Sequence, residues 1–119
     1  MSVNQRKFPR ANYPCTLTIW QGHSYNTILA NTANIGAGGF LVYLNQNLMV
    51  GAKVEVRINF SKQDIFECNG TVVRCQESLN GSQEPARYFA VAIAFEGLQQ
   101  EQVARIREII DQLLEENRE

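Results

Sequence analysis

The chain has 119 residues, 45% of them hydrophobic, which gives room for one domain with a single apolar core. Its formal net charge of -1 argues against a general binder of DNA or RNA. Its three cysteines lack CxxC spacing, which argues against a disulfide framework or a zinc site. No apolar run is long enough to span a membrane, and none follows the charged N-terminus, so we expect a cytoplasmic protein.

The start of the chain is polar and contains two prolines, which predicts a flexible, irregular arm over residues 1–14. A β-rich region follows over 15–97, where short segments alternate apolar and polar side chains or are rich in β-branched and aromatic residues. Glycine and asparagine clusters separate these segments, as turns between strands would. The expected strands cover residues 15–21, 24–33, 40–44, 53–60, 64–76 and 88–95.

An amphipathic helix is expected over residues 98–119, because apolar residues recur there at helical spacing after the break at Gly97. Many short strands followed by one helix predict a mainly β fold, an antiparallel barrel with a C-terminal α-helix. The whole chain then forms one domain. The helix either packs across a barrel opening or pairs with another chain, which leaves a homodimer open.

Charge is unevenly distributed along the chain. Residues 1–54 hold four basic residues and no acid, whereas seven acids and three arginines from residue 96 onward give a net charge of -4. The first half is therefore suited to a bound anion, although a short chain can also show such a bias by chance.

Few residues suggest catalysis. The only histidine, His23, lies in an expected hairpin turn without an acid nearby in the sequence, so a catalytic triad has little support. The glycines of 36–39 lack GxGxxG spacing and precede strand-forming residues, which excludes a dinucleotide-binding fingerprint. They are better explained by a tight turn that needs positive φ at one or more glycines. We expect no enzyme activity, no metal and no cofactor.

Two arginines of the arm, Arg6 and Arg10, lie four residues apart with Phe8 and Pro9 between them. An arginine side chain presents a planar set of donors that can grip phosphate oxygens or the edge of a guanine. Taken alone, such a cluster is more often a solvated basic tail, which is common at chain termini.

The arginine pair, followed after one expected hairpin by the turn Asn34-Ile35-Gly36-Ala37-Gly38-Gly39, resembles the PilZ family. The family pattern at this turn is (Asp/Asn)-x-Ser-x-x-Gly, and the resemblance covers nearly the whole chain. It implies a six-stranded antiparallel barrel with a C-terminal helix that binds cyclic di-GMP. It further implies Arg6 and Arg10 as the main ligands, Asn34 as a contact to guanine or a support for the arm, and Gly39 as a former of the turn.

The chain departs from the family pattern at Gly36, where the family usually has serine. A lost neutral hydrogen bond is worth about 0.5–1.5 kcal/mol, roughly a factor of two to ten in affinity, and we expect the backbone N–H groups around Gly36 to Gly38 to remain available. Arg74 resembles a basic strand end of the family. It either points towards the ligand or is an ordinary exposed strand residue.

The resemblance implies a bacterial receptor that changes conformation when it binds cyclic di-GMP and then signals to an unidentified protein partner. The alternative is a PilZ-like adaptor with weak or no nucleotide binding, which acts through protein–protein contacts in motility or pilus function. Gly36 favours the adaptor, whereas the intact arginine pair argues against it. Either one ligand molecule or an intercalated dimer is compatible with the sequence.

Overall fold

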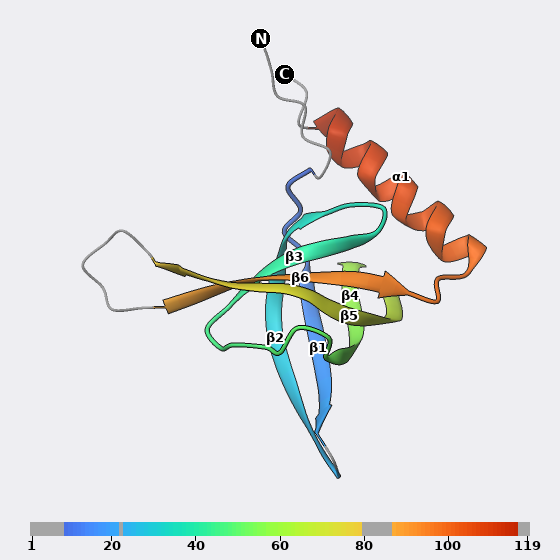
Figure 1. Cartoon of the computed structure of the whole chain (residues 1–119). Helices are drawn as coiled ribbons and strands as arrows, with labels where there is room; N and C mark the ends of the chain where they lie inside the picture. The colour runs from blue at the N-terminus through green and yellow to red at the C-terminus, as the bar shows by residue number, and fades with distance from the viewer. Residues whose placement is uncertain (1–8, 22, 80–86, 117–119) are drawn as a thin grey trace.

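The computed structural model describes residues 9–21, 23–79 and 87–116. Within these ranges the elements are β1 (Pro14–Gln21), β2 (Ser24–Ile35), β3 (Gly39–Leu44), β4 (Lys53–Ser61), β5 (Asp64–Leu79), β6 (Arg87–Glu96) and α1 (Gln100–Glu116). Each pair of neighbouring strands is antiparallel, and the sheet closes in the order β1-β2-β3-β6-β5-β4. The expected six-stranded antiparallel barrel with a C-terminal helix is therefore confirmed (Figure 1).

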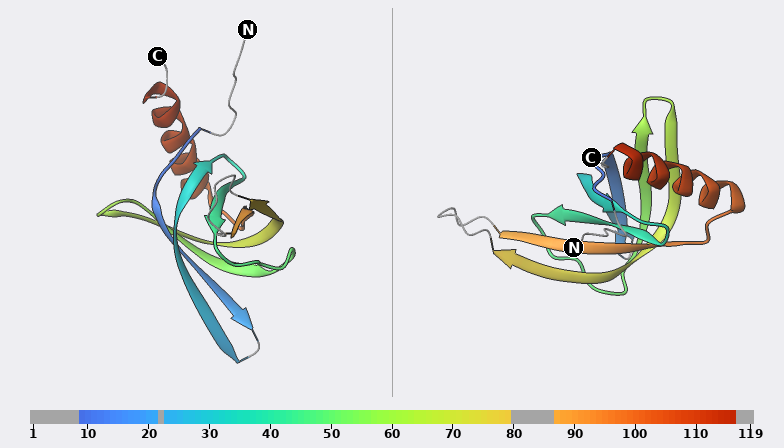
Figure 2. Two further views of the ribbon diagram at one scale, coloured as in Figure 1. Left: turned by 90° about the vertical axis from the view of Figure 1, so that its left-hand side faces the viewer. Right: turned by 90° about the horizontal axis from the view of Figure 1, so that it is seen from above.

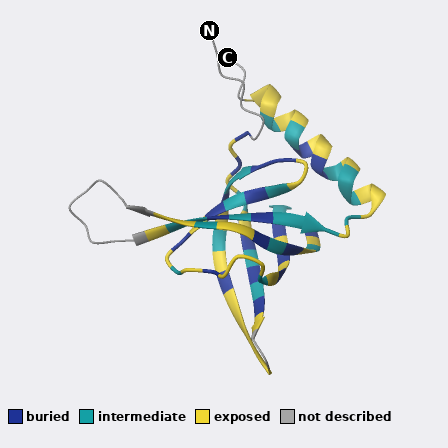
Figure 3. Cartoon of the chain, in the orientation of Figure 1, coloured by how far each residue is buried: buried dark blue, intermediate teal, exposed yellow. Residues whose placement is uncertain are grey.

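The alternation of apolar and polar residues that predicted the strands matches the alternation of buried and exposed side chains in the structure. In β4, Val54, Val56 and Ile58 are buried, while Lys53, Glu55 and Arg57 are exposed. Successive side chains of a strand point to opposite faces, so each strand supplies alternate residues to the barrel interior. Burying one such aliphatic side chain stabilises the fold by about 1.5–3 kcal/mol. Figure 3 shows buried and exposed residues alternating along the strands, with exposed residues prevailing on the β1–β2 hairpin.

The helix begins at Gln100 rather than at residue 98, because Gly97 reverses the chain with a φ of +66°. The backbone N–H of Gln99 donates to the Oε1 atom of Gln102 at 2.9 Å. The Nε2 atom of Gln102 donates to the carbonyl oxygen of Glu67 at 2.7 Å. The Gln102 side chain therefore caps the helix and ties its first turn to β5.

One face of α1 closes an end of the barrel, and Ile106 and Ile109 are only 1% and 3% exposed there. Arg105 forms an ion pair with Asp64, and its guanidinium lies 5.9 Å from the centroid of the Phe60 ring. Aromatic rings pack in series in this region, with centroids 5.0 to 5.7 Å apart, and they belong to Tyr13, Phe40, Phe60, Phe66 and Phe95. The helix thus packs across a barrel opening, whereas a homodimer stays a prediction. The left view of Figure 2 shows α1 at one end of the barrel and the β1–β2 hairpin projecting from the other.

Within the described ranges, α1 included, no helix has both the length and the apolar character needed to cross a membrane.

Candidate functional site

The last part of the expected arm lies along β2. The backbone N–H of Ile35 donates to the carbonyl oxygen of Pro9 at 3.2 Å, and the N–H of Ala11 donates to the carbonyl oxygen of Ala33 at 3.0 Å. Pro9 and Ala11 are both buried. Residues 9–11 are therefore held against the barrel, although the arm was expected to be irregular as far as residue 14.

A buried hydroxyl group strengthens this attachment. The Oγ1 atom of Thr32 donates to the carbonyl oxygen of Ala11 at 2.6 Å and accepts from the backbone N–H of Tyr13 at 3.0 Å. Thr32 is only 3% exposed, so its bond to Ala11 is shielded from competing water and its bond to Tyr13 is partly shielded. Through Thr32, β2 fixes the backbone on both sides of residue 12.

Arg10 lies directly opposite Asn34 in an isolated antiparallel bridge. Arg10 is exposed and Asn34 is half-buried at the end of β2. The structure therefore brings these two predicted site residues together. Arg6, the other predicted arginine, lies outside the described residues.

The turn at residues 36–39 is closed by a backbone hydrogen bond from the N–H of Gly36 to the carbonyl oxygen of Gly39, at 2.8 Å. The expectation that the Gly36 N–H remains available is therefore wrong, because Gly39 already accepts its hydrogen. Gly36 itself is buried.

The reason for glycine in this turn also differs from the expected one. The described glycines with positive φ are Gly51 and Gly97, so no glycine of 36–39 requires that conformation. A Cβ atom on Gly39 would instead lie 2.1 Å from the carbonyl oxygen of Ile93. Glycine is required at position 39 because β6 approaches the backbone of β3 closely.

Residues that are paired between neighbouring strands form a single line across the barrel wall, which starts at Arg10. Asn34 pairs with Leu41 of β3, Leu41 pairs with Ala92 of β6, and Ala92 pairs with Arg74 of β5. Paired residues of adjacent strands point to the same face of a sheet. We call this line, Arg10–Asn34–Leu41–Ala92–Arg74, the arginine row.

The arginine row lies on the outer face of the barrel. The neighbours of its members along β3 and β6, Val42, Val91 and Ile93, are at most 1% exposed and therefore point inwards. The alternation places Leu41 and Ala92 outwards. Among the residues that the structure describes, no carboxylate forms an ion pair with either arginine of the row.

Arg74 reaches the outer face because β5 is irregular just before it. The pairing with β6 shifts between Val72 and Arg74, and exposure changes from 0% at Val72 to 52% at Val73. The Nη2 atom of Arg74 donates to the Oε1 atom of Gln76 at 3.0 Å, which holds the guanidinium over the sheet. Arg74 is exposed, and its place in the row puts it on the same face as Arg10; whether it contacts the ligand stays a prediction.

Small side chains make the middle of this outer face a shallow depression. In the middle of β6 the outward residues are Ala90, Ala92 and Ala94, all half-buried. Tyr43 of β3 pairs with Ala90 and is 53% exposed, so an aromatic ring borders this shallow floor. Neither Tyr43 nor the alanines belong to a motif, although the alternation along residues 88–95 marks the alanines as outward-facing.

Comparison with known proteins agrees with this architecture. The family model of the PilZ domain matches residues 4–112, whereas no curated protein matches the chain in sequence.

Solved structures share the fold. The PilZ domain of YcgR from Escherichia coli, solved with c-di-GMP, has a TM-score of 0.74 at 18% identity, and the match covers 97% of this chain and 95% of that one. MrkH of K. pneumonia has a TM-score of 0.74 at 14% identity, with coverage of 98% and 52%. The Bacillus subtilis inhibitor of motility, MotI/DgrA, has a TM-score of 0.70 at 16% identity, with coverage of 100% and 56%. This chain therefore spans about half the length of the MrkH and MotI chains.

Proposed function

Because this chain belongs to the PilZ family, we propose that it is a receptor for cyclic di-GMP, which changes conformation on binding and signals to a partner protein. The arginine row is the observation that carries the proposal. It presents one arginine at each end and a shallow, small-residue floor between them. The similar PilZ domain of YcgR was solved with c-di-GMP.

The chemistry of the row suits this ligand. Cyclic di-GMP carries two phosphate charges and two guanines, and a guanidinium binds either group through paired hydrogen bonds. Adjacent strands lie about 4.8 Å apart, so the four spacings from Arg10 through β2, β3 and β6 to β5 separate the two ends of the row by roughly 19 Å along the sheet. A cyclic dinucleotide lying across β3 and β6 would meet one arginine at each side, with Leu41 and Ala92 beneath it.

The adaptor remains the second candidate, and Gly36 is the observation that favours it. The position lacks the serine hydroxyl of the family pattern, and its own N–H is occupied by Gly39. An adaptor would leave the arginine row without a nucleotide and would act only through protein contacts.

We also propose a binding rather than a catalytic role, without metal or cofactor, in the cytoplasm. Over the described ranges no three metal-ligating side chains gather in one place. The three cysteines are free. Burial raises the pKa of Cys15 and of Cys68 to about 11, which makes these two thiols poor nucleophiles and supports the non-catalytic role. Turnover of a nucleotide by the purified protein would overturn the non-catalytic role.

Calorimetric titration with cyclic di-GMP tests the main proposal. We expect saturable binding that Arg10→Ala and Arg74→Ala each weaken about ten-fold or more, because each removes charge-assisted hydrogen bonds. Arg107→Ala is the matched control, since Arg107 is also an exposed arginine but lies on α1. An Arg6→Ala/Arg10→Ala double variant extends the test to the arm.

Two results would reject the receptor. If the intact protein gives neither binding heat nor a thermal shift with cyclic di-GMP, the adaptor is the remaining candidate. The next experiment would then be a search for a protein partner. Binding that Arg10→Ala and Arg74→Ala leave unchanged would place the nucleotide away from the arginine row.

A further inference from the structure

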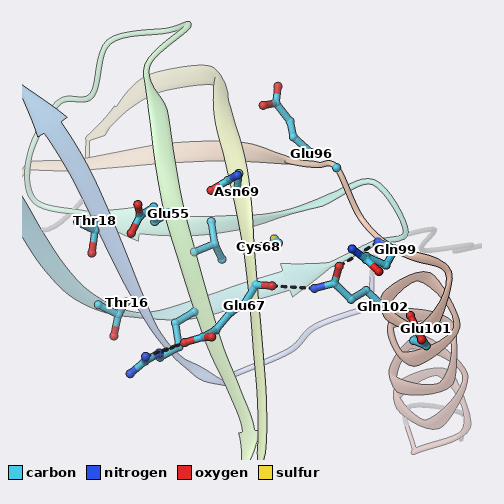
Figure 4. A pocket seen from close by; sticks show the side chains of 13 residues that line it. Thr16, Thr18, Glu55, Glu67, Cys68, Asn69, Glu96, Gln99, Glu101 and Gln102 are labelled. Carbon is cyan, nitrogen blue, oxygen red and sulfur yellow. Dashed lines mark hydrogen bonds and ion pairs between the residues drawn. The ribbon is translucent and has the colours of Figure 1, made fainter.

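A polar groove of 780 Å³ lies on the outer face of β1, β4 and β5 and extends to the first turn of α1. Four glutamates line it, Glu55, Glu67, Glu96 and Glu101. Figure 4 shows these side chains around the groove, three from the strands and Glu101 from the helix. No feature of the proposed nucleotide site uses them.

Strand register explains why these side chains gather. Thr18 of β1 pairs with Glu55 of β4, Glu55 pairs with Asn69 of β5, and Asn69 pairs with Glu96 of β6. This second line runs across the outer face just as the arginine row does. In the closed order of strands, β1 and β4 lie across the barrel from β3 and β6. The groove and the middle of the arginine row are therefore on opposite sides.

Two of the four carboxylates are compensated by neighbouring bases. Glu67 pairs with Arg57 at 2.6 Å, and Glu96 pairs with Lys53 at 3.2 Å. The hydroxyl of Thr71 also donates to Glu96, and this bond together with Lys53 lowers the pKa of Glu96. These two carboxylates are thus already partly neutralised.

Glu55 and Glu101 leave negative charge in the groove. Among the described residues, no lysine or arginine pairs with either of them. The contact of Glu55 is a neutral donor, the indole N–H of Trp20, whose Nε1 atom lies 3.3 Å from the Oε2 atom. The groove therefore favours a cationic occupant.

An exposed aromatic pair continues this surface along the β1–β2 hairpin. Trp20 and Tyr25 are directly opposite each other, their ring centroids are 4.8 Å apart, and they are 54% and 61% exposed. Tryptophan and tyrosine are enriched at the anchoring points of protein interfaces, and their ring faces attract guanidinium and ammonium groups. The contact between Trp20 and Glu55 joins the aromatic pair to the charged groove.

We propose that the groove and the aromatic pair together bind a basic, extended segment of a partner protein. One arginine or lysine of that segment packs against Trp20 and Tyr25, and further basic side chains meet Glu55 and Glu101. Charge complementarity selects this occupant. The part of the groove on β1 and β4 lies across the barrel from the middle of the arginine row, so partner and nucleotide bind without competing. The inference extends the partner-binding part of the proposed function, but binding to the groove does not require that a nucleotide binds.

Fluorescence anisotropy with a labelled peptide of alternating arginine and serine tests the inference on the full chain. We expect saturable binding that a peptide with glutamate in place of arginine does not show. Trp20→Ala should weaken it about two- to five-fold, as expected for an exposed cation–π contact. A Glu55→Gln/Glu101→Gln double variant should weaken it roughly three- to ten-fold. Asp111→Asn, which removes one charge from the exposed side of α1, should have no effect.

Three results would overturn the proposal. The first is absence of saturable binding to the basic peptide. The second is equal weakening by Asp111→Asn and by the Glu55→Gln/Glu101→Gln double variant, which would indicate unspecific attraction between opposite charges. The third is a concentration-dependent dimer that Trp20→Ala abolishes, since a second copy would then occupy the surface. Adding saturating cyclic di-GMP should leave the peptide affinity measurable. Because the peptide titration without nucleotide tests the groove alone, its failure is distinguishable from failure of the nucleotide site.

Discussion

Replacing Thr32 by valine tests how the barrel holds the segment that carries Arg10. The change keeps the shape of the side chain but removes the hydroxyl, so the carbonyl of Ala11 and the N–H of Tyr13 each lose a buried partner. An unsatisfied buried polar group costs about 1–3 kcal/mol. With some relaxation, we expect the free energy of unfolding to fall by about 2–4 kcal/mol.

Urea denaturation measures this loss. For a chain of this size, a slope of about 2 kcal/mol per molar urea converts the loss into a midpoint lower by roughly 1–2 M. Thr32→Ser is the matched control, because it keeps the hydroxyl and removes only a methyl group, at a cost of about 1 kcal/mol. Valine and serine variants of equal stability would refute the reasoning.

Hydrogen exchange separates global from local loosening. If the segment detaches without unfolding the barrel, the amide of Ala11, which donates to the carbonyl of Ala33, should exchange faster in Thr32→Val while amides of β6 stay protected. Affinity for cyclic di-GMP should fall in the same variant, because Arg10 would lose its fixed place opposite Asn34. An Ala11 amide that stays protected would mean that Thr32 does not hold the segment.

Three further outcomes follow from the geometry. Gly39→Ala should destabilise the fold by about 1–3 kcal/mol, because its Cβ would meet a carbonyl of β6, whereas Gly38→Ala, with open space around it, should be nearly neutral in thermal unfolding. The thiols of Cys15 and Cys68, with pKa values of about 11, should react slowly with a disulfide reagent at pH 8. Because these thiols ionise at lower pH in the unfolded chain than in the folded one, the free energy of unfolding should fall as the pH rises from 9 to 11. The NMR titration midpoint of Glu96 should lie below that of an ordinary glutamate, and the stabilising contribution of its hydrogen bonds should be lost as the pH falls through that lowered pKa. A midpoint at or above the ordinary value would contradict the observed contacts with Glu96.

Local patterns were sufficient to predict the elements of this fold. The alternation in residues 53–60 and 88–95 reports which side chains face the core, because a strand's period of two is imposed by its own backbone. The helix was recognised in the same way, but its start was not. That start depends on Gly97 and on the bond from Gln102 to the carbonyl of Glu67, a residue far away in the sequence.

The two outer surfaces could not be predicted in this way. Whether Asn34, Leu41, Ala92 and Arg74 form one row depends on the register between strands that are distant in sequence, which barrel closure and irregular pairing set. The wrong reason given for the glycines of the turn has the same origin, since a close approach between strands is invisible to a local pattern.

Magnitudes favour the receptor over the adaptor. The serine hydroxyl that Gly36 lacks is worth about 0.5–1.5 kcal/mol, whereas a hydrogen bond to a charged group is worth about 1.5–3 kcal/mol, roughly ten- to a hundred-fold in affinity. Arg10 and Arg74 both stand on the outer face without a described carboxylate to compete for them. The binding free energy lost at Gly36 is therefore smaller than the binding free energy that either arginine contributes. An adaptor would need a second defect in the arginine row, and the described residues of that row retain every group that the proposed binding uses.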